Sequence, residues 1–167
     1  MALDRAVTAK GLSDFTGTDR RFQYKGSLRA KNGDGNITIV DDYAHHPTEI
    51  RATLAAAANY PHKRIVCVFQ PHTYTRTKAF FNEFVDALTL ADMIVLADIY
   101  AAREKDTLGM SSSLIRDELT KKGKDAYYFS TFEEIEDFLG KKCLSGDLLI
   151  TMGAGDVVKI GEELLKE

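Results

Sequence analysis

Apolar and polar positions follow two different periods along most of the chain, one typical of strands and one typical of helices. Continuous apolar runs without alternation, at residues 65–69 and 93–99, are typical of parallel strands that are covered on both faces. Between such runs, apolar residues recur every three or four positions, as on the buried face of a helix. The pattern predicts two more strands, at 126–129 and 148–151, and helices at 47–59, around 80–88, at 111–122, at 131–140 and from Val157 to Leu165.

The first part of the chain has the pattern of a hairpin. A strand at 20–29 turns through the polar residues 32–35 into a second strand at 37–40, whereas residues 1–19 show only a weak helical pattern. Strand and helix then alternate to the end of the chain. This order predicts an α/β fold with a doubly wound, mostly parallel sheet, a hairpin strand at its edge and helices on both faces.

The composition fits one globular domain and argues against several classes of partner. The 167 residues are 44% hydrophobic and 28% charged, which is enough for an adequate core. The net charge of −3 provides no basic face for a phosphate backbone, so we expect no nucleic-acid partner. No apolar run is long enough to span a membrane, and no signal peptide is apparent. Cys67 and Cys143 form neither a disulfide framework nor a metal-ligand spacing, which favours a reducing cytoplasm.

The densest group of chemically active side chains lies where the strand at 37–40 gives way to the next helix. The run is Asp41, Asp42, Tyr43, Ala44, His45, His46 and Pro47. In open α/β sheets such a turn lies at the carboxyl end of a strand, where ligands bind. An ordinary polar turn would explain any one of these residues, but two carboxylates, a phenol and two imidazoles together indicate a site.

Two more loops, 70–77 and 152–156, follow predicted strands and are expected to meet the first loop at one crevice. In the former, Arg76 offers a planar fork for a carboxylate or phosphate; an ion pair with a surface acid is the alternative. In the latter, Gly153 and Gly155 can form a backbone nest for an anion. Val158 stands where a dinucleotide fingerprint needs its third glycine, and no phosphate-binding loop is present. Nucleotide chemistry would therefore be shared with another domain.

A metal site is the competing explanation of the four histidines, His45, His46, His62 and His72. Imidazole is a frequent metal ligand. However, adjacent histidines rarely point at one ion, and no predicted helix carries two histidines one turn apart. We therefore expect no metal site in this chain.

Four stretches resemble the C-terminal domain of the Mur ligases: residues 17–26, with Arg20, Arg21 and Phe22 at their centre, and residues 41–47, 69–77 and 152–156. They stand in the order of the family and span nearly the whole chain. The resemblance implies a Rossmann-like C-terminal domain at 20–167, preceded at 1–19 by a hinge or linker from a central ATPase domain that is missing here.

The resemblance also implies a reaction. Within the family, the 69–77 stretch favours the enzyme that joins L-alanine to UDP-N-acetylmuramate in bacterial peptidoglycan synthesis. With ATP and Mg²⁺, bound mainly by the central domain, the muramate carboxylate would become an acyl phosphate that the amino group of L-alanine attacks. The implied partners are these substrates and the N-terminal and central domains of the same chain. The C-terminal domain alone is expected to be inactive.

Residue roles follow from the same resemblance. Arg21 would reach the ATP phosphates and Asp42 would hold the ribose. Tyr43 and His45 would flank the incoming alanine, and Arg76 would bind its carboxylate or a neighbouring phosphate. Because imidazole titrates near neutrality, we add the hypothesis that His45 accepts a proton from the alanine ammonium group.

One departure from the family pattern affects how the carboxylate is bound. Thr73 stands where some members have a second arginine, so Arg76 would act with backbone amides of the loop from Gly153 to Asp156 instead. Two alternatives to the L-alanine ligase stay open. One is the recycling ligase that attaches a whole tripeptide to the same sugar and has a similar 41–47 run; the other is a non-catalytic Rossmann-like binding module.

Overall fold

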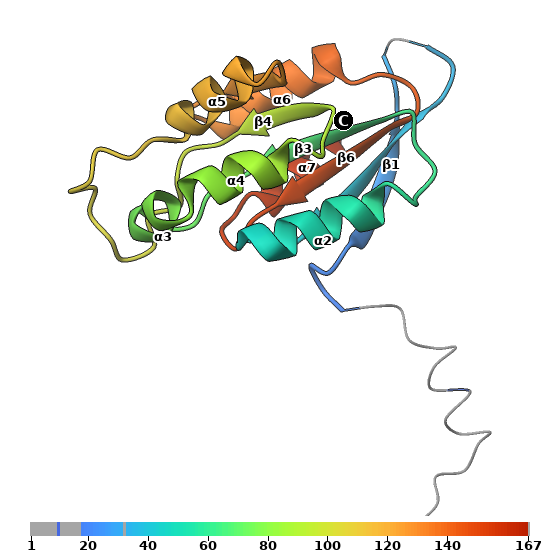
Figure 1. Ribbon diagram of the computed structural model, residues 1–167. Coiled ribbons are helices and arrows are strands. Elements are labelled where there is room, and N and C mark those ends of the chain that lie inside the picture. The colour runs from blue at the N-terminus through green and yellow to red at the C-terminus, as the bar shows by residue number, and fades with distance from the viewer. Residues whose placement is uncertain (1–9, 11–17, 32, 167) are drawn as a thin grey trace, which may run out of the picture.

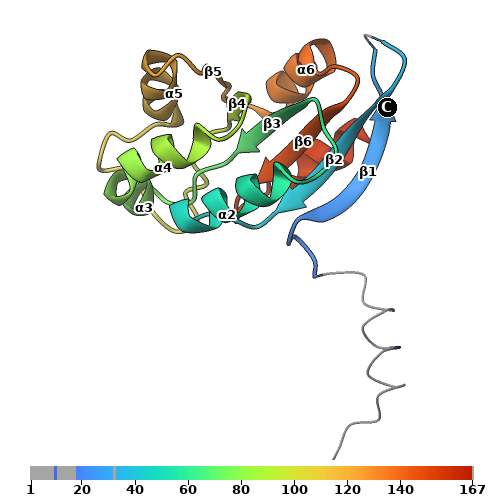
Figure 2. The same ribbon diagram turned by 45° about the vertical axis from the view of Figure 1, so that its right-hand side comes forward.

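The computed structural model describes residues 10, 18–31 and 33–166, and within them six strands form one sheet in the order β1-β2-β6-β3-β4-β5 (Figure 1). β1 pairs antiparallel with β2, whereas the other neighbouring strands are parallel. Figure 2 shows β1 at the outer edge of the sheet, beside β2. The predicted edge hairpin and mostly parallel sheet are confirmed. The strands are β1 (Gln23–Arg29), β2 (Asn36–Asp42), β3 (Arg64–Phe69), β4 (Met93–Leu96), β5 (Asp125–Tyr128) and β6 (Asp147–Met152).

Helices cover both faces of this sheet, as the doubly wound prediction requires. One core lies between the sheet and the helices α2, α4 and α5, and the other lies between the sheet and α6 and α7. Figure 1 shows α2 and α4 in front of the strands and α7 behind them. The helices are α2 (Pro47–Ala57), α3 (Tyr74–Ala79), α4 (Phe81–Leu88), α5 (Ser112–Lys121), α6 (Phe132–Lys142) and α7 (Val158–Leu164).

Local capping explains where two of the helices begin. At α2, His46 accepts a hydrogen bond from the backbone N–H of Thr48, and Glu49 accepts one from the N–H of His46, with Pro47 in the first turn. A capping box of Thr131 and Glu134 likewise starts α6. The polar run at 41–47 therefore ends in a fixed helix start.

Several boundaries differ from the predictions. β2 continues through Asp42, two residues further than expected, because Asp41 and Asp42 pair in register with Thr151 and Met152 of β6. α6 runs to Lys142, past the predicted end at 140. The helix predicted around 80–88 is α4, and a separate short helix that was not predicted, α3, precedes it and meets it at Phe80. Most of the predicted linker at 1–19 lies outside the described residues.

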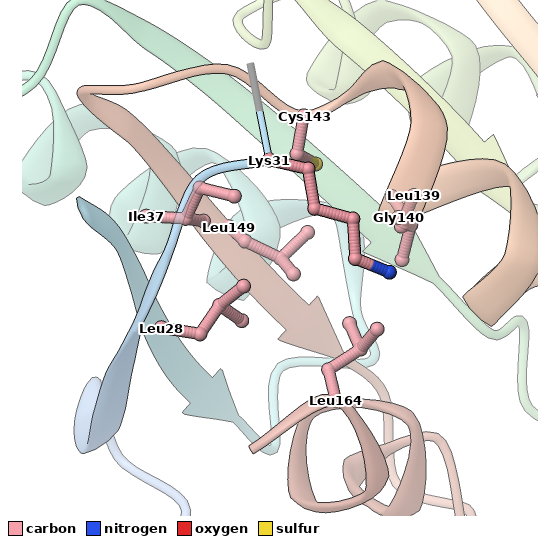
Figure 3. Close-up of a pocket in the computed structure, with 8 residues that line it drawn as sticks. All are labelled: Leu28, Lys31, Ile37, Leu139, Gly140, Cys143, Leu149 and Leu164. Carbon is pink, nitrogen blue, oxygen red and sulfur yellow. The ribbon is translucent and has the colours of Figure 1, made fainter. Parts of the chain in front are cut away.

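A small apolar cavity of about 20 Å³ lies between the sheet and the helices α6 and α7 (Figure 3). A cavity of this size holds one water molecule at most, and an apolar lining leaves such a water without partners. The cavity is therefore a packing gap and not the ligand site. Its lining residues are Leu28, Lys31, Ile37, Leu139, Gly140, Cys143, Leu149 and Leu164.

The described helices are short, with at most 11 residues in α2 and α6. Among the residues that the structure describes, no helix has the length and apolar character needed to cross a bilayer.

Candidate functional site

The three loops singled out above meet at the carboxyl ends of β2, β6 and β3, which are neighbours in the sheet. Backbone hydrogen bonds join them: the N–H of Gly153 donates to the carbonyl of Asp42 at 3.1 Å, and the N–H of Gln70 donates to that of Met152 at 3.0 Å. The Gln70 side chain adds bonds to Asp156 (3.1 Å) and to the backbone N–H of Val157 (3.2 Å). The chain therefore builds one crevice from segments that are far apart in sequence.

Asp41 and Asp42 both come from the end of β2 but have different partners. Asp41 is fully buried and accepts hydrogen bonds from the Thr151 hydroxyl (2.8 Å) and from Nε of Arg20 (2.8 Å). Each Asp42 oxygen accepts one backbone N–H, from Phe22 and from Ala44, at 2.8 Å. Asp42 thus ties the start of the hairpin to the turn that carries Tyr43 and His45, and each of its oxygens keeps a second lone pair.

An open groove of about 370 Å³ runs beside Asp42 along α2. Arg21 lies on this groove as well, so the two residues predicted to hold ATP face the same space. Glu49 is a third charged residue on this groove. Burial raises its pKa, but hydrogen bonds from the backbone N–H groups of His45 and His46 lower it, as do the charges of His45 and Arg21. The net result is a pKa below the usual value. The remaining lining is Phe22, Ala52, Thr53 and Ala56.

Tyr43 and His45 lie side by side in the turn that follows β2. Their ring centroids are 5.3 Å apart in an edge-on contact. Nδ1 of His45 is 3.0 Å from the carbonyl oxygen of Tyr43 and 3.4 Å from a carboxylate oxygen of Glu49. Since a carbonyl oxygen can only accept, Nδ1 carries the hydrogen in this bond, and in the neutral ring Nε2 keeps its lone pair. The geometry therefore leaves His45 one nitrogen that can take up a proton.

The loop after β3 brings His72 and Arg76 to the same place. The His72 ring lies 5.9 Å from that of His45 and stacks on Tyr100 at 5.6 Å. Burial, and then the positive charge of Arg76, lower the pKa of His72 and so favour the neutral ring. Nδ1 of His72 and one terminal nitrogen of Arg76 are buried without a hydrogen-bond partner among the described residues. Both nitrogens therefore have donor capacity that no described residue uses.

The backbone before Arg76 is held in an uncommon conformation. Thr73 has a φ of 65°, which is rare for a β-branched residue, and its N–H donates to the carbonyl of Tyr100 at 2.9 Å. Glu104 accepts hydrogen bonds from the N–H (2.9 Å) and hydroxyl of Thr75. These bonds lower the pKa of Glu104. Strain at Thr73 and the bonds to Glu104 together fix where the Arg76 side chain leaves α3.

The glycine loop is fixed by groups on both of its sides. Gly153 has a φ of 150°, and a Cβ there would lie 2.7 Å from the carbonyl oxygen of Gln70. Its N–H is already bonded to Asp42, and its carbonyl accepts a hydrogen bond from Arg20 at 2.7 Å. Arg20 also donates to the carbonyl of Gly155 at 3.0 Å. In the predicted nest, the N–H of Gly153 is therefore occupied, and a ligand would meet the amides that follow it.

Sequence reasoning did not select several residues that shape this site. Gln70 and His72 stood inside a loop that was singled out, so their position was the available signal. Arg20 stood only in a quoted stretch, and Glu104 lies in a loop that carried no signal at all. For metal ions, the described residues include no group of three or more potential His, Cys, Asp or Glu ligands.

The fold and the crevice define the class of protein: a doubly wound α/β domain that presents arginines, imidazoles and a glycine loop at the carboxyl ends of its strands, as ligand-binding domains of this architecture do. The chain belongs to the Mur ligase family, because residues 20–155 match the family model described as "Mur ligase, glutamate ligase domain".

Named relatives agree with this assignment. The chain is 62% identical over 167 residues to the UDP-N-acetylmuramate–L-alanine ligase of Agathobacter rectalis, covering 100% of this chain and 35% of that protein. It is 66% identical over 158 residues to the ligase of the same name from Lachnoclostridium phytofermentans, covering 95% and 32%. The chain thus spans about a third of the length of these relatives.

Solved structures give the same result for the fold. The crystal structure of the UDP-N-acetylmuramate–alanine ligase from Thermotoga maritima matches with a TM-score of 0.74 and 29% identity, covering 98% of this chain and 33% of that one. The Rossmann-like expectation is confirmed by this likeness. A murein peptide ligase from Psychrobacter arcticus shares the fold with a TM-score of 0.71 at 24% identity, covering 94% of this chain and 31% of that one.

Proposed function

We propose that this chain is the C-terminal domain of an ATP-dependent ligase that joins L-alanine to UDP-N-acetylmuramate, and that its crevice receives the L-alanine. The buried, unpaired nitrogens of Arg76 and His72 are the observation that carries the proposal. Both nitrogens can donate to a carboxylate, and the aromatic rings of Tyr43, His45 and His72 stand beside them. A small amino acid fits such a site because its carboxylate satisfies the donors while its methyl group contacts ring surface.

His45 is the proton acceptor in this proposal. An amine attacks only when it is unprotonated, so the alanine ammonium group must lose a proton before it attacks the acyl phosphate. Because Nδ1 of His45 donates to the Tyr43 carbonyl, the lone pair on Nε2 is available to take up this proton. Glu49, 3.4 Å from Nδ1, stabilises the ring once it becomes positively charged.

The nucleotide lies in the groove along α2 in this proposal. Arg21 contacts the ATP phosphates, and Asp42 accepts a hydrogen bond from the ribose with the second lone pair of one oxygen. Mg²⁺ and most ATP contacts come from a central domain, to which residues 1–19 are the proposed linker. The 20–167 domain alone therefore binds weakly and is inactive, because half of a cleft lacks both contacts and preorganisation. The site of action is the bacterial cytoplasm, where ATP is available.

Phosphate release by the full-length ligase tests the proposal. With ATP, Mg²⁺ and UDP-N-acetylmuramate present, L-alanine should stimulate release, and the stem tripeptide should not. Arg76→Ala should abolish the stimulation at moderate L-alanine. Arg116→Ala is the matched control, because that arginine is paired with Asp117 on the exposed side of α5 and should change nothing. Preference for the tripeptide would identify the recycling ligase, and no release with either acceptor would leave a non-catalytic binding module.

The role of His45 needs a separate test. His45→Gln should lower the rate at saturating L-alanine and remove the acidic limb of its pH profile. His62→Gln is a close control, because Nδ1 of His62 contacts the carbonyl of Tyr60, also two residues earlier, at 2.6 Å. An unchanged rate and pH profile in the His45 variant would refute the proton-accepting role.

A further inference from the structure

The Arg20 side chain makes three hydrogen bonds that join the start of the domain to the crevice. Nε donates to Asp41 at 2.8 Å, and the two terminal nitrogens donate to the carbonyls of Gly155 (3.0 Å) and Gly153 (2.7 Å). The fork of one guanidinium therefore spans the end of β2 and the loop after β6. Only arginine has a planar head with enough donors for this arrangement.

The acid that Arg20 contacts is completely buried. Asp41 has no exposed surface, and its other oxygen accepts the Thr151 hydroxyl at 2.8 Å. A buried carboxylate must be paired, and Arg20, with 22% of its side chain exposed, supplies the positive charge. The pair is anchored on two central strands, so the guanidinium has a rigid support from which to hold the glycine loop.

Arg20 also positions Tyr43. The guanidinium carbon lies 4.9 Å from the centroid of the Tyr43 ring, within the range of a cation–π contact. The N–H of Tyr43 donates to the carbonyl of Arg20 at 2.7 Å. Arg20 itself has a φ of 56°, and its N–H is bonded to the Gln23 side chain at 3.0 Å. Both its backbone and its side chain therefore hold groups that face the crevice.

We propose that Arg20 is a positioning residue for the amino-acid acceptor: it acts through the Tyr43 ring and the carbonyls of Gly153 and Gly155, and it does not touch the substrate. The inference rests on the proposed function. Because Arg21 follows directly and faces the groove along α2, a shift of Arg20 would move the nucleotide and acceptor sides of the turn together. This makes the backbone at Arg20 and Arg21 the connection between the two binding regions.

A matched pair elsewhere separates positioning from ordinary stabilisation. Arg64 bonds both oxygens of Asp147, at 3.1 and 2.6 Å, and donates to the carbonyl of Lys142 at 3.1 Å. Asp147 is buried like Asp41, but it lies at the first residue of β6, whereas the crevice lies beyond the last. Arg64→Ala therefore removes the same kind of ion pair without touching the crevice.

The experiment compares Arg20→Lys and Arg20→Ala with Arg64→Ala in the full-length ligase. Arg20→Lys keeps the charge beside Asp41, and hence the fold, but one ammonium group cannot hold three acceptors in this geometry. We expect both Arg20 variants to raise KM for L-alanine by about tenfold or more. KM for ATP should rise less, and Arg64→Ala should leave both values unchanged while lowering the melting temperature. Added guanidinium chloride should partly restore the KM for L-alanine of Arg20→Ala and of no other variant, with the same concentration of sodium chloride as the control.

A second readout does not depend on catalysis. In the 167-residue chain, Arg20→Lys should accelerate amide hydrogen exchange in peptides that cover residues 152–157, and Arg64→Ala should not. If the wild-type enzyme shows no activity with L-alanine, the proposed function fails, and the exchange result decides whether Arg20 orders the loop. An unchanged KM for L-alanine in an active Arg20→Lys enzyme, or unchanged exchange in the loop, would overturn the inference.

Discussion

Gly155→Ala tests how tightly the crevice is built. Gly155 has no left-handed φ, so its backbone accepts alanine, but the new Cβ would lie 2.3 Å from Oε1 of Gln70. An ordinary contact begins at 3.4 Å, so the Gln70 amide must move by about 1 Å. That movement breaks the bond from the buried N–H of Val157, which is already 3.2 Å long. The Tyr100 ring, 2.8 Å from the same Cβ, is partly exposed and can turn away.

The expected cost follows from the lost hydrogen bond. An unpaired buried N–H costs about 1–3 kcal/mol. Alanine has less conformational freedom than glycine in the unfolded chain, and this stabilises the folded state by about 0.4–1 kcal/mol. Gly155→Ala should therefore lower the free energy of unfolding by roughly 1–2 kcal/mol.

Urea unfolding of the 167-residue chain, followed by circular dichroism, measures this cost, and Gln70→Ala completes a double-mutant cycle. Gln70→Ala leaves the same N–H of Val157 unpaired but removes the obstacle to the new methyl group. The double variant should therefore be no less stable than Gln70→Ala alone, with a coupling of about 1–2 kcal/mol. Additive costs, or an unaffected Gly155→Ala, would refute the close contact as the cause.

Three further predictions concern stability. Gly140→Ala, inside α6, should raise the free energy of unfolding by about 0.5–1 kcal/mol, since its Cβ meets only Nζ of Lys31 at 3.6 Å; a loss in urea unfolding would contradict this. Phe84→Ala should cost about 3–5 kcal/mol, because its fully buried ring packs on Phe69 at 5.6 Å; a cost near zero would show that the core collapses around the change. The pKa of His72 is lowered in the folded protein, so the unfolded chain binds a proton at this ring more readily. The free energy of unfolding of the wild type should therefore fall as the pH drops below 6.5, and that of His72→Gln should fall less. Parallel curves of unfolding free energy against pH for the two proteins would contradict this.

The elements of this fold could be predicted from local patterns. Apolar residues at helical spacing predicted a helix at 47–59, and the apolar run at 65–69 predicted a strand covered on both faces; both elements are present. The ends of elements were harder to predict when tertiary pairing decided them. β2 continues through Asp41 and Asp42 only because β6 is there to pair with them, which no local pattern records.

The connections within the site could not be predicted in the same way. The loops were expected at one crevice because parallel strands end on one edge, and that argument needs no side-chain detail. The bonds from Arg20 to Gly153 and Gly155 join residues 133 and 135 positions apart. Such contacts depend on the order of strands in the sheet and on the left-handed backbone of Arg20, and neither follows from the residue types.

The place of β6 in the middle of the sheet has a consequence for the synthesis of the protein. β6 lies between β2 and β3, and its Leu148 pairs with Thr38 and with Ile65, which the ribosome makes much earlier. Until residue 152 has left the exit tunnel, the hairpin of β1 and β2 has no neighbour to join it to β3 and β4. Until then, the edges of β2 and β3 that pair with β6 stay unpaired in the nascent chain. This state favours binding by a chaperone.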